Sequence, residues 1–463
     1  MSSTLATVVY CSFILAIMLL ERDRKSRVSW AVWIPIVWLS ISASRTVSQW
    51  FGTGTLIRPD QIVDGSPFDA FIFSVLLAAG LVVLIARRRR AAAFVRGNWP
   101  LLIFFAYCLV SCLWSDYSFV AFKRWTKAVG DLVMVLIILT DPEPTAAIKR
   151  LLARVGFLLI PLSILLIKYY PSLGRNYSPW TGELENTGVG TQKNNLGYVC
   201  LIFGLGCFWY LLEAFRGGKR TRRLGPMLAH GAILVLALRL FWLSSSATSF
   251  SCFLIGCFLM VFTSLPGFAR KPALVHIVVA TILFTIVYAL FLNPGAGLTE
   301  TVGRDATLTG RTAIWSQLLD MTVNPMFGAG YESFWSPERT RAIWKGNWWH
   351  ANQAHNGYLQ LYLDLGWVGV VLVSLVMISG YRSVVRSLRR DPEAGKLKLA
   401  FLVIAAIYNL TEHAFRELHP VWIAFLLAVI VIPEGAAQIK TKTRRAVSPR
   451  AFSSEVAPCL EEV

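Results

Sequence analysis

Residues 153–170 read ARVGFLLIPLSILLIKYY, an apolar run whose charged residues lie only near its ends. As a helix, a run of this length rises roughly 27 Å and nearly crosses a hydrocarbon core of about 30 Å. Backbone groups in lipid must satisfy their own hydrogen bonds, so each such run is expected to be helical. Comparable runs lie at 4–20, 29–44, 68–86, 98–114, 125–140, 196–215, 228–243, 249–265, 273–292, 358–380, 399–414 and 418–433. The sequence therefore predicts an all-α polytopic membrane protein with about 12–13 transmembrane helices.

Composition and charge agree with this class. The 463 residues are 55% hydrophobic with a mean hydropathy of +0.56, which excludes an ordinary soluble protein. A net charge of +19 would suit a nucleic-acid partner, but the basic residues lie mainly in alternate connections, such as 87–90, 216–223 and 382–398. The positive-inside bias assigns these connections to the cytoplasm, with the N-terminus outside and the C-terminus inside. We therefore expect membrane lipids as surroundings and no nucleic-acid partner.

The chain is expected to form one polytopic membrane domain over 1–433, followed by a disordered cytoplasmic tail over 434–463. The first apolar run has no basic residues before it and no small-residue cleavage site, so it is interpreted as a retained helix and not a signal peptide. Most of the eight cysteines fall in apolar runs and none forms a CxxC pair. The cysteines therefore support neither a metal site nor a redox cofactor.

One connection, 293–357, is much longer than the others and is predicted to face outward. Long connections in compact folds are usually functional or disordered, and five Trp residues argue against disorder here. Residues 311–323 have helical spacing, with Ile314 and Leu318 on one side. This helix could lie along the outer membrane surface or pack on top of the bundle. We interpret the connection as the cap of an active site.

Two residues of this connection are the candidate catalytic groups. His355 lies where the connection meets the next apolar run, and an imidazole there can accept a proton near neutral pH. Arg311 opens the predicted amphipathic helix, and a guanidinium suits bidentate contact with phosphate oxygens. The alternatives are a histidine that only orients the helix start and a solvated arginine. Asn356, beside His355, is a candidate substrate ligand.

Several cations are expected on the outer side against the positive-inside trend. Singly, each could be an anchor at a helix end, but together they would suit a diphosphate head group. Asn194 follows one of them and is a candidate substrate ligand as well. The cations are Lys123, Arg124, Arg175, Lys193, Arg304 and Arg311.

Glu412 is the candidate acidic residue of the substrate-binding site, because a carboxylate inside a membrane segment is costly and usually functional. Its alternative is an ion pair with one of the basic residues. Its neighbour His413 would point elsewhere if both lay on a helix, since adjacent helical residues diverge by about 100°. Neither the histidine spacing nor any outer acidic pair indicates a metal site.

The order of the motifs resembles the O-antigen ligase and Wzy-type polysaccharide polymerase superfamily, most closely exopolysaccharide polymerases of the ExoQ type. Within the late connection the motifs are Gly310-Arg311 with Trp315, Asn324-Pro325 with Gly328-Ala329-Gly330, His355-Asn356 with Leu359, and Leu365-Gly366-Trp367-Val368-Gly369. Earlier motifs are Leu113-Trp114-Ser115, Gly188-Val189-Gly190 with Lys193-Asn194 and Leu196-Gly197, and Ser246-Ala247-Thr248.

The resemblance implies a GT-C-like bundle in the bacterial inner membrane, with its active site facing the periplasm. It implies metal-independent transfer from undecaprenyl-diphosphate-linked oligosaccharide to an acceptor glycan or glycolipid. By this analogy Arg311 contacts the diphosphate and His355 activates the acceptor hydroxyl, with Lys123, Arg124, Arg175 and Lys193 as further diphosphate ligands. Polymerase and ligase are not distinguished, and polysaccharide export proteins are expected as further partners. The alternatives are a lipid-linked oligosaccharide flippase or other transporter, and a non-catalytic export subunit.

Overall fold

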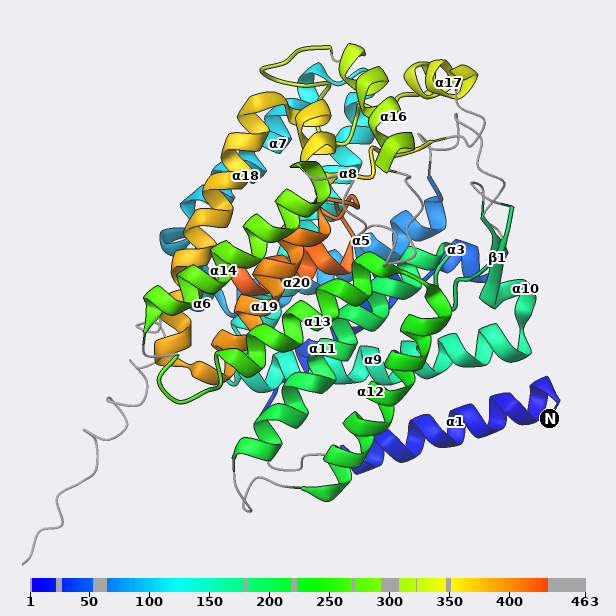
Figure 1. Ribbon diagram of the computed structural model, residues 1–463, viewed down its shortest axis with the longest axis vertical. Helices are drawn as coiled ribbons and strands as arrows, with labels where there is room; N and C mark the ends of the chain where they lie inside the picture. Colours follow the sequence, from blue (N-terminus) through cyan, green and yellow to red (C-terminus); the bar gives the residue numbers. More distant parts are fainter. Residues whose placement is uncertain are drawn as a thin grey trace, which may run out of the picture.

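The computed structural model describes residues 2–21, 27–52, 65–178, 182–217, 223–268, 271–292, 308–321, 323–346 and 351–431. These residues are almost entirely helical (Figure 1). A small antiparallel pair, β1 (Arg175–Tyr177) with β2 (Leu184–Asn186), is the one sheet within these ranges. The all-α fold class is confirmed.

Each apolar run predicted from the sequence overlaps a helix, although α19 ends at Tyr408, within the run 399–414. Seven of the described helices are long and apolar enough to cross a membrane, or eight if the bent pair α6 and α7 forms one span. The number is below the expected 12–13 because α2, α13, α19 and α20 are short and α8 carries charged residues. The helices are α1 (Ser3–Leu20), η1 (Trp30–Val32), α2 (Trp33–Ser42), α3 (Val47–Trp50), α5 (Pro67–Ala86), α6 (Arg88–Gly97), α7 (Trp99–Ser111), η2 (Cys112–Trp114), α8 (Ser118–Leu139), α9 (Pro144–Tyr169), α10 (Pro171–Gly174), α11 (Lys193–Arg216), α12 (Leu224–Ser244), α13 (Ala247–Phe262), α14 (Pro272–Val287) with a π turn (Tyr288–Leu292), α16 (Leu308–Asp320), α17 (Pro337–Gly346), α18 (Gly357–Arg390), α19 (Pro392–Tyr408) and α20 (Pro420–Val429).

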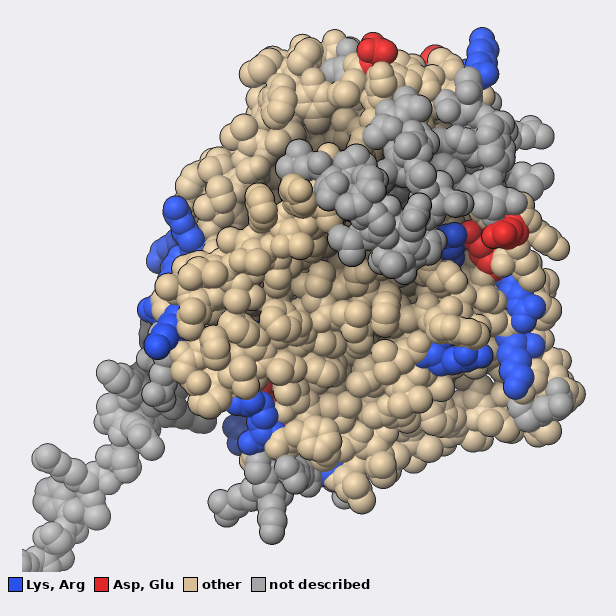
Figure 2. Space-filling view, viewed as in Figure 1, with Lys and Arg blue, Asp and Glu red and all other residues tan. Residues whose placement is uncertain are grey.

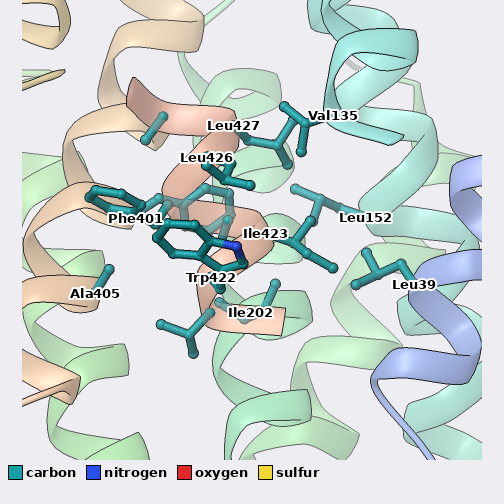
Figure 3. Packing of buried hydrophobic residues seen from close by; sticks show 14 of the residues in the cluster. Leu39, Val135, Leu152, Ile202, Phe401, Ala405, Trp422, Ile423, Leu426 and Leu427 are labelled. Atoms are coloured by element: carbon teal, nitrogen blue, oxygen red, sulfur yellow. The ribbon is translucent and has the colours of Figure 1, made fainter. Parts of the chain in front are cut away.

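The short helix α20 forms the centre of the bundle. All ten of its residues are buried, as expected for a helix that is apolar on every side. Figure 3 shows Trp422, Ile423, Leu426 and Leu427 of α20 among side chains from α2, α8, α9, α11 and α19. Lipid is as apolar as these side chains, so close packing rather than exclusion of water holds such helices together. A Cβ on Gly130 of α8, for example, would lie 2.2 Å from the Trp38 ring.

The connections between helices meet at two opposite ends of the bundle. At one end Arg154 contacts Glu21 at 2.7 Å and Lys396 contacts Glu213 at 2.6 Å. At the other end Arg45 donates to the Gly188 carbonyl at 3.3 Å, and Asn186 donates to the Leu243 carbonyl at 3.0 Å. The basic connection 87–98 and the connections 140–144 and 390–392 belong to the first end, where Arg87 pairs with Asp141 and Lys149 with Glu393. Alternate connections therefore lie at opposite ends, as the charge distribution predicts.

The described part of the long connection folds into a cap with a hydrophobic core of its own. In Figure 1, α16 and α17 lie at the top, beside the first turns of α18. Helix α16 spans Leu308–Asp320 rather than 311–323. Its Ile314 and Leu318 are buried, so these side chains pack on protein, as one of the two alternatives predicted. The cap core contains Ile314, Leu318, Ala329, Phe334, Ile343, Ala351, Ala354 and Leu363. Residues 293–307, 347–350 and the predicted tail 434–463 lie outside the described residues.

A break in α18 fastens the cap to the bundle. Gly366 has φ 63° and ψ −166°, a conformation that is essentially restricted to glycine. The break exposes backbone groups to the cap: Trp367 N donates to the Pro325 carbonyl at 2.9 Å, and Ala329 N donates to the Leu363 carbonyl at 3.0 Å. Asp364 adds a carboxylate that accepts from Ser333 N at 2.9 Å and Phe334 N at 2.8 Å.

We expect Gly366→Ala to detach the cap. Its Cβ would lie 2.3 Å from the Met326 backbone, and the backbone strain alone would cost about 1–3 kcal/mol. The measurement is the rate of protease cleavage within 323–346 in detergent, which should rise relative to wild type. Gly231→Ala is the matched control, because a Cβ there meets no atom within 4 Å. Equal cleavage of the two variants would contradict this account of the break.

Candidate functional site

A polar cavity of about 370 Å³ opens at the end of the bundle that carries the cap. Its walls come from the end of α2 and its following turn, the start of α11, and the connection between α19 and α20. Asn352 and Gln353 of the cap contribute to the lining as well. Segments separated by hundreds of residues thus surround one space, which is typical of a binding site.

Glu412 lines this cavity and lies close to His355, which is not among the lining residues. Both are buried, and His355 Nδ1 lies 3.6 Å from Glu412 Oε2. This distance is longer than a hydrogen bond, but it is short enough for the carboxylate to stabilise an imidazolium. Asn194 donates to Glu412 Oε1 at 3.0 Å and accepts from Ser246 Oγ at 3.3 Å. The carboxylate is therefore fixed on one side by an amide while its other oxygen faces the imidazole.

The connection between α19 and α20 positions Glu412 by folding back on α18. Helix α19 ends at Tyr408, where Asn409 follows and its Oδ1 accepts from Ala414 N at 2.9 Å and Phe415 N at 3.0 Å. Gly357 N donates to the Asn409 carbonyl at 2.8 Å and to the Glu412 carbonyl at 3.0 Å. The first turn of α18, which follows His355, is thereby joined to the Glu412 segment.

This arrangement corrects one expectation. The run 399–414 was predicted to be helical, so that Glu412 and His413 would diverge by about 100°. The helix stops at Tyr408, and both Glu412 and His413 line the same cavity. The prediction failed because the Asn409 side chain, and not a backbone carbonyl one turn earlier, accepts from Ala414 N and Phe415 N. Apolar composition does not reveal such a bond.

The remaining predicted site residues lie as follows. Asn194 and Glu412 line the cavity, and Asn356 caps α18 by accepting from Tyr358 N and Leu359 N. Arg311 lies on α16 with its side chain outside the described structure, and Arg304 lies outside it entirely. Diphosphate binding by the predicted cations stays a prediction. Of these cations, Lys193 pairs with Glu185 at 2.8 Å, Arg175 donates to the Ile167 carbonyl at 3.1 Å, Arg124 donates to the Glu332 carbonyl, and Lys123 lies 5.2 Å from the Phe119 ring.

Sequence reasoning missed two cations that line the cavity, Lys127 and Arg416. Lys127 is a helical turn beyond Lys123 and Arg124, so the spacing on α8 could have indicated it. Arg416 had no local signal, because it lies in the irregular connection. Within the described ranges, no group of three or more His, Cys, Asp or Glu side chains is placed to hold a metal ion.

Backbone strain is concentrated around the site. The described non-glycine residues with positive φ are Ser245 (48°), Glu332 (50°), His355 (48°) and Leu418 (60°). Leu418 lines the cavity, and Ser245 precedes the serine that bonds Asn194. Such conformations cost free energy and tend to persist at functional sites.

A second acid–imidazole pair lies beside the first. His413 Nε2 is 3.7 Å from Glu332 Oε1. Burial, reinforced by Arg416, His419 and His355, holds the pKa of His413 well below its usual value. Burial, with Glu417 and Asp364, raises the pKa of Glu332 well above its usual value. Both shifts favour the uncharged form of the side chain.

We expect His413→Gln to protect the protein against mild acid. The unfolded chain takes up a proton at His413 near pH 6.5 while the folded state resists it, so stability is lost as pH falls below that value. The loss is up to about 1.4 kcal/mol per pH unit for one group. Thermal unfolding at pH 7 and pH 5.5 measures it, with His276→Gln on the exposed side of α14 as control. An identical acid shift in wild type and both variants would contradict the prediction.

A known protein family resembles the part of the chain that includes the cap. Residues 231–374 match the family model described as O-antigen ligase. The resemblance predicted from the motifs is confirmed. The matched segment runs from within α12 through the cap to the middle of α18, and it contains both Arg311 and His355.

A curated relative extends the likeness beyond this segment. The chain is 25% identical over 345 residues to the exopolysaccharide production protein ExoQ of Rhizobium meliloti (strain 1021). The alignment covers 69% of this chain and 74% of the relative. Together with the apolar helices, the two likenesses indicate a multi-pass membrane protein that is similar to O-antigen ligases and to ExoQ.

Proposed function

We propose that this protein is a membrane glycosyltransferase that joins undecaprenyl-diphosphate-linked oligosaccharide to a sugar hydroxyl of an acceptor glycan or glycolipid. The observation that carries the proposal is a buried series of contacts from His355 to Glu412 and on to Asn194, of which Glu412 and Asn194 line a polar cavity under the cap. A buried imidazole beside a fixed carboxylate suits general-base chemistry. The likeness to O-antigen ligases supplies the reaction class.

In the proposed reaction the acceptor hydroxyl attacks the anomeric carbon of the donor. The new glycosidic bond forms as the bond to the diphosphate oxygen breaks, with inversion at the carbon. His355 takes the hydroxyl proton, and Glu412 stabilises the imidazolium that results. The electron pair of the broken bond leaves with undecaprenyl diphosphate, so no metal or cofactor is required.

Charge on the departing diphosphate needs fixed cations, which commonly contribute several kcal/mol in such sites. Lys127 and Arg416 line the cavity and are the described cations best placed for this role. Arg311 of α16 remains our candidate for bidentate contact with the diphosphate, assisted by Lys123, Arg124, Arg175, Lys193 and Arg304. Asn194 acts by holding Glu412, and Asn356 by starting the helix that follows His355.

The proposed site faces the periplasm from the bacterial inner membrane. The basic connections lie at the end of the bundle opposite the cavity, and positive connections remain in the cytoplasm. A donor assembled on a lipid carrier would reach the cavity from the outer leaflet. Polysaccharide export proteins are the partners we expect for the product.

The test is an in vitro reaction with the purified full chain in detergent. It would receive undecaprenyl-diphosphate oligosaccharide alone, or the same donor with a lipid A core acceptor, and the products would be resolved by size. A ladder from donor alone identifies a polymerase, and consumption only with the core acceptor identifies a ligase. If the protein transfers sugar in neither reaction but moves the donor across vesicle membranes, it is a flippase and the proposal is wrong.

A further inference from the structure

A second cavity, of about 410 Å³, lies at the end of the bundle away from the cap. Its walls come from α6, the connection between α8 and α9, the last turns of α18, the start of α19 and the end of α20. None of its lining residues belongs to the site of the proposed reaction. In Figure 2, blue Lys and Arg atoms gather on the left edge, where Figure 1 has α6 and the lower part of α18.

The lining has an excess of positive charge. Four cations, Arg90, Arg386, Arg390 and Lys398, face two carboxylates, Asp141 and Asp391. Both carboxylates have partners of their own. Asp141 Oδ2 lies 3.2 Å from Arg87, which is outside the lining. Asp391 caps α19 by accepting from Ala394 N at 3.2 Å, and it accepts from Thr145 Oγ1 at 3.3 Å.

The cations keep donors available for a ligand. Lys398 is half-buried, and it makes no hydrogen bond or ion pair with any residue of the described ranges. Arg90 uses Nη1 to donate to the Thr140 carbonyl at 3.0 Å, and Arg386 uses Nε to donate to the Arg382 carbonyl at 3.2 Å. Each guanidinium has further N–H groups, and these remain available to a ligand when one N–H is already hydrogen-bonded. The arrangement suits an anion with several oxygen acceptors, such as a phosphate ester.

Apart from Thr145, Ser383 and Ser387, the rest of the lining is apolar. Leu139, Ile148, Ala428, Ile430 and Val431 form the wall, and the lining contains no aromatic residue on which a nucleobase could stack. A positive-inside bias explains exposed arginines at a helix end, but it does not explain a basic cavity with an apolar wall. An anion that carries a hydrocarbon chain would satisfy both parts at once.

We infer that this cavity binds the phosphate group of an anionic phospholipid, with part of an acyl chain against the apolar wall. The cavity lies at the end of α18, a membrane-spanning helix, which is the depth at which phospholipid head groups are found. This inference is independent of the proposed glycosyl transfer. Bound lipid would brace α18, α19 and α20 together at the end remote from the cap.

The test measures lipid retention by native mass spectrometry of the purified full chain. Detergent-solubilised protein would be titrated with phosphatidylglycerol, with phosphatidylcholine, and with water-soluble glycerol phosphate. The double variant Arg90→Gln/Lys398→Gln should bind phosphatidylglycerol on the order of twentyfold more weakly, because each basic residue near an anionic lipid typically contributes about fivefold. The matched control Arg382→Gln/Arg389→Gln removes two exposed cations of α18 that do not line the cavity, and should bind like wild type.

Each outcome bears on the inference. The charge-preserving double variant Arg90→Lys/Lys398→Arg should retain binding, which separates a charge effect from misfolding. Equal retention of phosphatidylcholine and phosphatidylglycerol, or equal losses in the lining and control variants, would overturn the inference. Glycerol phosphate that competes as well as the intact lipid would also overturn the lipid assignment and leave a simple phosphate site.

Discussion

Replacing His355 with alanine should lower the rate of glycosyl transfer by on the order of 10²- to 10⁴-fold, the usual contribution of a general base. The protein should still insert and fold, because His355 is one residue at the edge of the cap core. His355 has φ 48°, where alanine is strained, so His355→Asn should be measured beside it. Asparagine tolerates this backbone conformation, and a similar loss in both variants would assign the effect to the imidazole.

The matched control is His276→Ala. This histidine is exposed on α14 and bonds Tyr381, so its loss should leave transfer unchanged. Initial rates at saturating donor measure the chemical step, and gel filtration with thermal unfolding checks that the variants are folded. Transfer by His355→Asn within a few fold of wild type would remove His355 from the mechanism and leave it as a residue that precedes the cap of α18.

Glu412→Gln should give the second largest loss, about 10²-fold in kcat. The comparable change in a hydrogen-bonded Ser-His-Asp triad costs about 10⁴-fold, and the 3.6 Å separation here argues for a smaller effect. Glutamine keeps the size of the side chain and an oxygen that can accept from Asn194, so the cavity should keep its shape. KM for the donor should change little, because the carboxylate acts on the imidazole rather than on the substrate.

Glu393→Gln is the matched control, since Glu393 pairs with Lys149 at the opposite end of the bundle. The measurement is kcat and KM across pH 6 to 9 for wild type and both variants. A positioning carboxylate predicts that the pH dependence of kcat changes in Glu412→Gln and not in Glu393→Gln. A rise in KM with unchanged kcat would instead make Glu412 a ligand of the substrate.

Most of the residues that line the cavity could not be predicted from the sequence, and the reason is physical. Hydropathy and helical spacing act over neighbouring residues, so they located the apolar helices and α16, and they failed where a helix ends within an apolar run. The sequence indicated Glu412 because a carboxylate in a membrane segment is costly. It did not indicate which side chains lie beside Glu412 in space. Asn194 is 218 residues away from Glu412 along the chain.

The order of the amino acids was enough to predict the all-α membrane class, most of the helix positions and the long connection that ends at His355. These follow from local composition, because a backbone in lipid has few ways to satisfy its hydrogen bonds. Only the tertiary structure decided that α19 stops at Tyr408, that Glu412 and His413 share one cavity with Lys127 and Arg416, and that α18 breaks at Gly366 to hold the cap. Those features depend on hydrogen bonds between distant segments, which form only when the bundle has brought them together.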